Sequence, residues 1–196
     1  LLVGLTQSAF FPIIRPSGLR RKDAELREAL AKRAMEYLVN QLRRKKEGAS
    51  PLGLGSGRAV DAFVKQYSQI FRGKQVVCAS KRTEALAKER GLEVVDGNGI
   101  AKIDWYIDGA DRVDATGNLI KGGGGAHKRD KGVRVKAKTF LCLVQESKIV
   151  PFFERHNFPL PCEITKDAST SEVLNDIDNV IGGEAQLRSV KRGNSF

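Results

Sequence analysis

The chain has 196 residues, of which 41% are hydrophobic, and a formal net charge of +11 at pH 7. This length and apolar content suffice for a buried core in one domain, with room for a small appendage, and they exclude a disordered or fibrous protein. No stretch approaches the roughly 20 apolar residues that a membrane helix needs, so we expect no membrane association.

The amino-terminal segment, residues 1–22, is predicted to be a basic arm outside the core. It contains no acidic residue, and Pro12, Pro16 and Gly18 interrupt any regular element. Its composition is compatible with the remainder of an organellar targeting segment, which favours a mitochondrion or another organelle over the cytoplasm. The first 50 residues hold 11 Lys and Arg against 5 Asp and Glu, so RNA or a larger assembly is a candidate partner of this region.

The strongest predicted helix begins at Asp23, a suitable N-cap, and ends in the basic run at residues 43–46. Its apolar residues recur at helical spacing: Leu26, Leu30, Ala34, Leu38 and Leu42. The basic end complements the helix dipole, which explains these charges without nucleic acid.

Strand and helix patterns then alternate. Strands are predicted at 52–54, 75–79, 92–95, 105–107 and 139–144, with helical patterns at 60–70 and 83–90. This alternation predicts an α/β fold: a Rossmann-like parallel sheet with helices on both faces, over residues 23–158.

The last segment, 159–196, is predicted to begin a smaller carboxyl-terminal α+β lobe that is truncated here. Residues 160–164 have the composition of a strand. Ser169 and Glu172 form a capping box for a helix that ends at Gly182. The three cysteines, Cys78, Cys142 and Cys162, lie far apart, which is typical of free buried thiols in an intracellular, reducing compartment.

Two predicted strands end in loops that suit an anion. Residues 53–57 place three glycines and Ser56 before a helix, where backbone N–H groups can approach a phosphate. Taken alone, an ordinary tight turn explains these glycines equally well. Ser80 and Thr83 stand with two cations at the next helix start, and both loops fall at the carboxyl edge of a parallel sheet.

Two further motifs are more specific. Asp108 and Asp111 follow an apolar strand, and the small residues between them leave room for a ligand. Lys121 precedes a run of four glycines, residues 122–125. A linker is the plain interpretation of such a run, but its position directly after an apolar pair and a lysine favours a binding site.

In order and spacing these motifs resemble type A ribose-5-phosphate isomerases, over about residues 24–196. The resemblance rests on Asp108-Gly-Ala-Asp111, residues 119–126, Glu146-Ser-Lys148, residues 158–161 with Glu163, and the loops at 53–57 and 80–83. It implies interconversion of ribose 5-phosphate and ribulose 5-phosphate in the pentose-phosphate pathway, through an enediolate and without metal or organic cofactor. It also implies a homodimer.

The resemblance implies a role for each site residue. Asp108 and Asp111 would handle ring hydroxyls, Lys121 would stabilise the enediolate, and a carboxylate at position 130 would move the proton. The residues expected to hold the phosphate and the sugar are Gly55, Ser56, Gly57, Ser80, Thr83, Gly122, Gly123 and Lys148.

The chain departs from the family pattern at the catalytic base. Asp130 replaces a glutamate and loses one methylene of reach, and a misplacement of about 1 Å can cost on the order of 100-fold in rate. His127, Lys128 and Arg112 also differ from the family; His127 is predicted to be an exposed loop residue rather than a replacement base. Two alternatives therefore stand beside a weak isomerase: a retired isomerase fold in a ribonucleoprotein such as an organellar ribosome, and a sugar-phosphate sensor without turnover.

Overall fold

The computed structural model describes residues 50–153 and 158–188, together with the helical positions Glu25, Ala29, Lys32, Arg33, Glu36 and Tyr37. The predicted arm at 1–22 and both ends of the helix predicted from Asp23 lie outside the described residues. The chain divides into two compact units, residues 1–161 and 162–196. No helix in the described part is long and apolar enough to cross a membrane.

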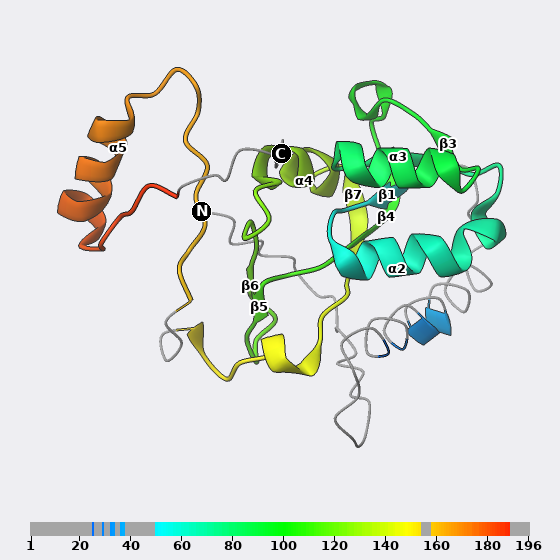
Figure 1. Ribbon diagram of the computed structural model, residues 1–196, viewed down its shortest axis with the longest axis horizontal. Helices are drawn as coiled ribbons and strands as arrows, with labels where there is room; N and C mark the ends of the chain where they lie inside the picture. The colour runs from blue at the N-terminus through cyan, green and yellow to red at the C-terminus, as the bar shows by residue number, and fades with distance from the viewer. Residues whose placement is uncertain are drawn as a thin grey trace. The chain divides into compact units, whose positions relative to one another are not determined.

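Five parallel strands form the sheet of the first unit, in the order β3-β2-β1-β4-β7 (Figure 1). Their bounds are Leu52–Leu54 for β1, Gln75–Cys78 for β2, Glu93–Val94 for β3, Ile103–Asp108 for β4 and Ala137–Cys142 for β7. The chain begins at the central strand β1, proceeds outward to β3 and then returns to β4. The strand order therefore reverses between β1 and β4, and ligands of α/β sheets bind at such a reversal.

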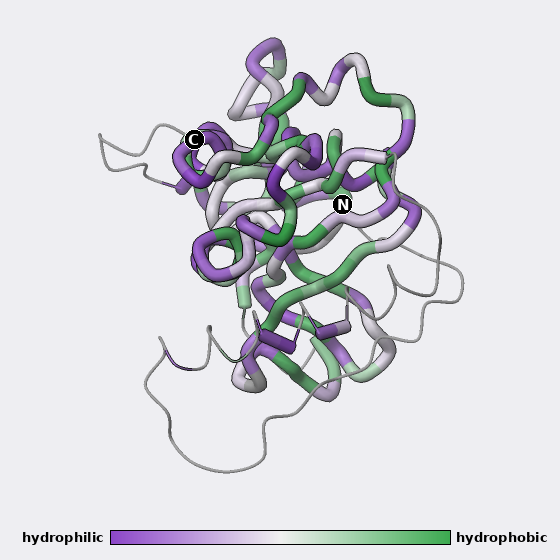
Figure 2. The backbone as a smooth tube through the Cα atoms, turned by 90° about the vertical axis from the view of Figure 1, so that its right-hand side faces the viewer, coloured by the Kyte–Doolittle hydropathy of each residue, from purple (hydrophilic) through white to green (hydrophobic). Residues whose placement is uncertain are grey.

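Helices cover both faces of this sheet, as the sequence predicts. Helix α2 (Arg58–Tyr67) and helix α3 (Lys81–Glu89) contribute to one core, which contains Trp105 and Ile107 of β4. Helix α4 (His127–Arg134) contributes to the other core, which contains Ile103 and Tyr106. Strand β4 therefore contributes buried side chains to both cores. Figure 2 shows hydrophobic segments of the backbone beside more hydrophilic ones.

Short elements complete the first unit. They are the 3₁₀ helices at Ser68–Phe71, Gly97–Gly99 and Glu146–Lys148 and a two-stranded antiparallel hairpin of β5 (Arg112–Val113) and β6 (Leu119–Ile120). Asp114 organises the hairpin loop, because its carboxylate accepts hydrogen bonds from the backbone N–H groups of Thr116 and Asn118.

The strand predicted at 160–164 is wrong: this segment has no regular structure, and Leu160 is 54% exposed. Pro159 and Pro161 lack the backbone N–H that a central strand must donate. The other predicted strands are present, with ends that differ by up to two residues.

In the second unit, helix α5 (Thr170–Asp176) begins as predicted. Ser169 is its N-cap and accepts a hydrogen bond from the backbone N–H of Glu172. A π-helical turn at Ile177–Ile181 follows, and Gly182 then ends the helix at a φ of 69°, in the left-handed region that favours glycine.

Cys78 and Cys142 are free thiols, and burial raises the pKa of each to about 12. The prediction of three buried cysteines is wrong for Cys162, which is exposed, while Cys78 and Cys142 are half-buried.

Candidate functional site

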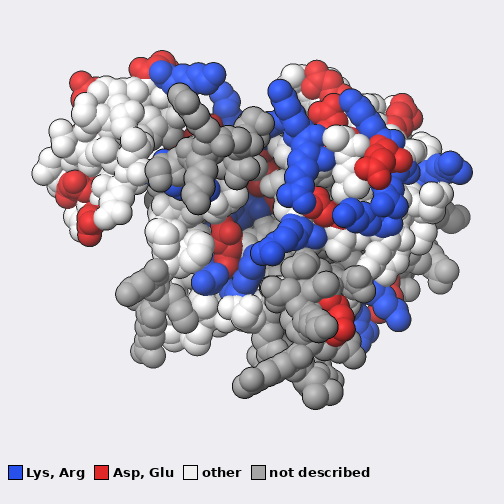
Figure 3. Space-filling view, viewed as in Figure 1, with Lys and Arg blue, Asp and Glu red and all other residues white. Residues whose placement is uncertain are grey.

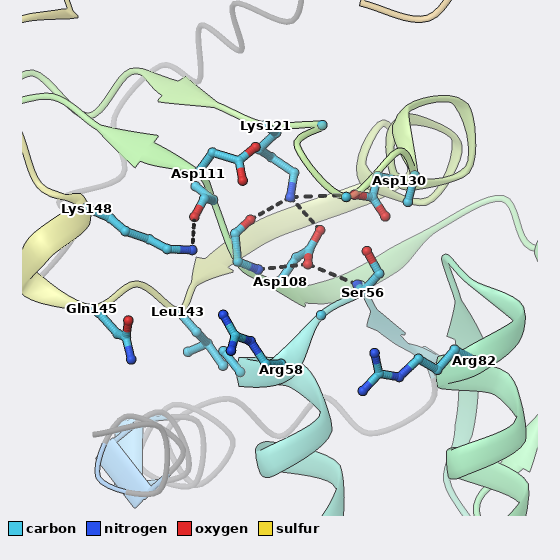
Figure 4. A pocket seen from close by; sticks show the side chains of 17 residues that line it. Ser56, Arg58, Arg82, Asp108, Asp111, Lys121, Asp130, Leu143, Gln145 and Lys148 are labelled. Atoms are coloured by element: carbon cyan, nitrogen blue, oxygen red, sulfur yellow. Dashed lines mark hydrogen bonds and ion pairs between the residues drawn. The ribbon is translucent and has the colours of Figure 1, made fainter. Parts of the chain in front are cut away.

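A cavity of about 310 Å³ lies at the carboxyl edge of the sheet, next to the ends of the neighbouring strands β1 and β4 (Figure 4). The charged side chains that line it are Arg58, Arg82, Lys121, Lys148, Asp108, Asp111 and Asp130. Figure 3 shows Lys and Arg side chains gathered near the middle of one face, next to a few acidic ones. The cavity is large enough for a small polar ligand and offers charges of both signs to it.

Asp108 ends β4 and is 1% exposed. Its Oδ1 accepts hydrogen bonds from the backbone N–H groups of Ser56 (3.0 Å) and Gly109 (2.7 Å). Its Oδ2 accepts from the hydroxyl of Tyr106 (2.7 Å) and from Nζ of Lys121 (2.6 Å). Four donors occupy the acceptor positions of a carboxylate, so this geometry does not favour the predicted contact between Asp108 and a ring hydroxyl.

Gly55 allows this arrangement, because only a residue without a side chain lets the backbone approach Asp108 so closely. A Cβ atom at Gly55 would lie 1.9 Å from Cγ of Asp108. The carboxyl group cannot move away without breaking its four hydrogen bonds.

We therefore expect Gly55→Ala to lower the free energy of unfolding by about 3 kcal/mol, a typical upper cost of overpacking a core. Gly99→Ala is the matched control, because a Cβ atom there meets nothing within 4 Å. Urea unfolding of both variants measures the difference. Equal stability of the two variants would show that the close approach to Asp108 carries no cost.

Lys121 and Asp130 lie side by side in the cavity and form its candidate reactive centre. Nζ of Lys121 lies 3.6 Å from Asp130 and also donates to the carbonyl oxygen of Gly109 (2.5 Å). Burial disfavours the charge of Lys121, but Asp108 and Asp130 outweigh burial and raise its pKa. Burial and the charge of Asp108 raise the pKa of Asp130 to about 7, against the opposing effect of Lys121. Asp130 can therefore accept or release a proton near neutral pH.

The four glycines do not form a linker, because Gly122 and Gly124 line the cavity and Gly123 contacts Asp111. Gly122 has a φ of 107° and packs against the ring of His127, and Gly125 has a φ of 86°. Gly123 donates its N–H to Asp111 Oδ2 (2.7 Å), and a Cβ atom at this position would lie 2.7 Å from the other oxygen of that carboxylate. The run therefore fixes the orientation of Asp111.

His127 is the first residue of α4 and is half-buried, so the prediction of an exposed loop histidine is wrong. It does not line the cavity. The sequence concealed this helix because residues 127–134 are almost all polar, and only Val133 among them belongs to a buried apolar cluster.

The prediction that the motifs gather at one edge of the sheet is confirmed. The predicted residues that line the cavity are Ser56, Gly57, Asp108, Asp111, Lys121, Gly122, Asp130 and Lys148. Gly55, Gly123, Ser80 and Thr83 lie outside the lining. Thr83 is 1% exposed and donates its hydroxyl proton to the carbonyl oxygen of Gly55 (2.8 Å), while Ser80 caps α3 by accepting the N–H of Thr83 (3.1 Å). Both hydroxyls thus bind backbone groups that stabilise the loops, and neither lines the cavity.

Sequence reasoning missed Arg58 and Gln145, and it noted Arg82 only as one cation of a loop. Arg58 and Arg82 stand in the first turns of α2 and α3, beside the two predicted anion loops. Arg82 forms an ion pair with the buried Asp61 of α2. The sequence did contain a signal for Arg58, because this arginine directly follows a glycine-rich loop at the start of a helix.

Lys148 closes the other end of the cavity, where its Nζ donates to the carbonyl oxygen of Ala110 (2.7 Å). Burial lowers its pKa, although the nearby Asp111 opposes this effect. The described residues contain no group of three His, Cys, Asp or Glu side chains that could hold a metal ion.

Residues 75–196 match the model of a family described as ribose 5-phosphate isomerase A (phosphoriboisomerase A). A protein named ribose-5-phosphate isomerase A from Staphylococcus epidermidis is 40% identical over 136 residues, which cover 67% of this chain and 57% of that protein. One from Legionella pneumophila is 36% identical over 166 residues, which cover 84% of this chain and 71% of that protein. The chain thus spans about 57% of the length of the staphylococcal relative.

Solved structures show the same fold. A D-ribose-5-phosphate isomerase in complex with phospho-erythronic acid superposes with a TM-score of 0.76 at 27% identity, over 89% of this chain and 73% of that one. The ribose 5-phosphate isomerase A of Methanocaldococcus jannaschii superposes with a TM-score of 0.73 at 28% identity, over 87% of this chain and 73% of that one.

Proposed function

The chain belongs to the ribose 5-phosphate isomerase A family, and we propose that it interconverts ribose 5-phosphate and ribulose 5-phosphate. One observation carries the proposal: in a polar cavity, the carboxyl group of Asp130, with a pKa of about 7, lies 3.6 Å from the ammonium group of Lys121. A base of matched pKa beside a fixed cation is what proton transfer next to a carbonyl group requires.

In the proposed reaction, Asp130 removes the proton from C2 of the open-chain aldose. The electron pair forms the C1–C2 double bond, and the aldehyde oxygen at C1 takes up the negative charge, which Lys121 stabilises. Asp130 then returns the proton to C1 while the hydroxyl proton on O2 moves to O1, which leaves a ketone at C2. Asp111 suits the hydroxyl transfers, because no described residue donates a hydrogen bond to its Oδ1.

The phosphate group is proposed to bind at the start of α2. Ser56 and Gly57 line the cavity there, and the helix N-terminus presents backbone N–H groups to an anion. Arg58 and Arg82 add two guanidinium groups to the same part of the cavity wall (Figure 4). The complex of a related isomerase with phospho-erythronic acid supports a sugar phosphate as the ligand class.

The pKa of Asp130 predicts the pH dependence of the reaction. Because a general base must be ionised, we expect kcat/KM to fall as the pH drops through about 7 and to level off above that value. Initial rates measured between about pH 5 and pH 9 test this. A rate that stays constant across neutral pH would exclude Asp130 as the group whose ionisation limits the reaction.

The direct test of the function is the formation of ribulose 5-phosphate from ribose 5-phosphate by the purified chain. Turnover that saturates with substrate supports the isomerase. Binding of RNA that weakens with salt, without any turnover, is instead the result expected of a retired isomerase fold in a ribonucleoprotein. Binding of ribose 5-phosphate without turnover would indicate a sensor.

A further inference from the structure

The proposed mechanism leaves Tyr106 of β4 without a role, although it contacts the reactive centre. Its side chain is fully buried, and its hydroxyl donates a 2.7 Å hydrogen bond to Oδ2 of Asp108. The ring stacks on Phe140 of β7, with centroids 5.4 Å apart and planes at 29°. Packing therefore fixes the position from which the hydroxyl reaches the carboxylate.

Each carboxylate oxygen of Asp108 accepts two hydrogen bonds. Oδ2 is shared by the hydroxyl of Tyr106 and Nζ of Lys121, and Oδ1 is bound by the backbone at Ser56 and Gly109. The ammonium group that contacts Asp108 at 2.6 Å lies 3.6 Å from Asp130. The position of Asp108 thus determines the position of the Lys121 ammonium group relative to Asp130.

We propose that Tyr106 is a positioning residue that tunes the basicity of Asp130, by holding Asp108 in place against Lys121. The kinetic part of this inference rests on the proposed isomerase function. The part that concerns proton binding by Asp130 is independent of that function, because it rests on the contacts that join Tyr106, Asp108 and Lys121 and on the charges around Asp130.

The groups around the reactive centre come from four parts of the first unit: Asp108 and Tyr106 from β4, Lys121 from the segment after β6, Cys142 from β7 and, through its interaction with Tyr106, Arg134 from α4. Cys142 remains a neutral thiol near pH 7, because burial raises its pKa. After burial itself, the charge of Asp108 raises the pKa of Asp130, whereas Lys121 and the hydroxyl of Tyr106 lower it. Loss of the hydroxyl and loss of the Asp108 charge should therefore act in opposite directions.

The experiment is a titration of Asp130 in the full chain, labelled with ¹³C at aspartate carboxyl groups and followed by NMR, with Asp130→Asn to assign the signal. Tyr106→Phe removes the hydroxyl that binds Oδ2 of Asp108. Asp108 then holds Lys121 less firmly beside Asp130, so we expect the midpoint for Asp130 to rise by about one pH unit, because Lys121 lowers it. Asp108→Asn should lower that midpoint. Tyr67→Phe, a half-buried tyrosine of α2 that packs on Phe63, is the control and should leave it unchanged.

A loss of stability alone does not move a titration in two opposite directions. In the isomerase assay, Tyr106→Phe should shift the acidic limb of the rate profile upward by the same amount and leave KM unchanged. If the titration moves as expected and no variant forms ribulose 5-phosphate, the positioning role stands and the proposed function fails.

An unchanged Asp130 midpoint in a folded Tyr106→Phe protein would overturn the proposal. If that variant does not fold, replacement of the three tyrosines by 3-fluorotyrosine decides the matter, because the fluorinated phenol is a stronger donor of nearly the same shape. It should lower the midpoint for Asp130, and no shift, or a shift upward, would overturn the proposal.

Discussion

We expect Asp130→Asn to lower the rate of ribulose 5-phosphate formation by about 1,000-fold, within the range that general acid–base catalysis contributes. The asparagine amide has nearly the same shape as the carboxyl group but cannot accept the C2 proton. The affinity for substrate should change little, because the proposed phosphate contacts at Ser56 and Gly57 remain. Steady-state kinetics separate the two effects, since kcat should fall while KM stays near its original value.

The same substitution should not weaken the fold. Burial and Asp108 raise the pKa of Asp130 to about 7, from an ordinary value of 3.8. A group with a raised carboxyl pKa destabilises the folded state increasingly as the pH rises from its unfolded pKa through its folded pKa. We therefore expect the free energy of unfolding at pH 8 to stay equal or to increase in Asp130→Asn. Asp104→Asn, at the other end of β4, is the control for activity, and a similar loss of rate there would argue against a specific role for Asp130.

We expect Lys121→Met to lower kcat by about 100-fold to 1,000-fold, the usual cost of removing one group that stabilises an oxyanion. Methionine preserves an unbranched chain but removes the ammonium group that binds Asp108 and faces Asp130. The pKa of Asp130 should also rise, because Lys121 opposes its upward shift. The acidic limb of the rate profile should then move to higher pH.

Lys121→Met should cost about 3 to 5 kcal/mol of stability as well, because it leaves the buried carboxylate of Asp108 without its cation. Kinetics must therefore be measured where thermal unfolding shows the variant to be folded. Lys88→Met, which removes an exposed ion pair with Glu84, is the control and should change stability by less than about 1 kcal/mol. Full activity in a folded Lys121→Met protein would exclude Lys121 as the stabiliser of the enediolate.

Much of the site was predictable because parallel strands end at the same edge of a sheet. Asp108 and the loop at 53–57 each follow an apolar strand, so their meeting required only the strand assignment. Lys121 and the glycine run could be assigned to the site because their spacing from Asp108 resembles the pattern of one family.

Other features depend on contacts that one sequence does not reveal. Helix α4 carries Asp130 but has no apolar period, so its residues read as a polar loop. The hydroxyl of Tyr106 acts within a strand whose pattern predicts only burial. Position 55 requires glycine because the side chain of Asp108, more than 50 residues away, packs against it. In the sequence, a glycine in a turn gives no sign of such a contact.

The roles of the hydroxyl groups in the loop at 80–83 also could not be predicted from the sequence. Ser80 and Thr83 lie at the predicted edge, but their hydroxyls bind the backbone of α3 and of Gly55 rather than facing the cavity. Hydroxyl groups at a helix start serve equally as caps and as phosphate ligands, so composition alone does not distinguish the two.

Substitution of Asp130 tests most directly whether this chain is an isomerase and whether Asp130 is its base. The measurement is the rate of ribulose 5-phosphate formation at saturating ribose 5-phosphate by the unaltered chain, by Asp130→Asn and by Asp130→Glu. We predict a measurable rate for the unaltered chain, its loss in Asp130→Asn and a higher rate in Asp130→Glu, because the added methylene restores reach to the proton. Equal background rates for all three proteins would contradict the claim.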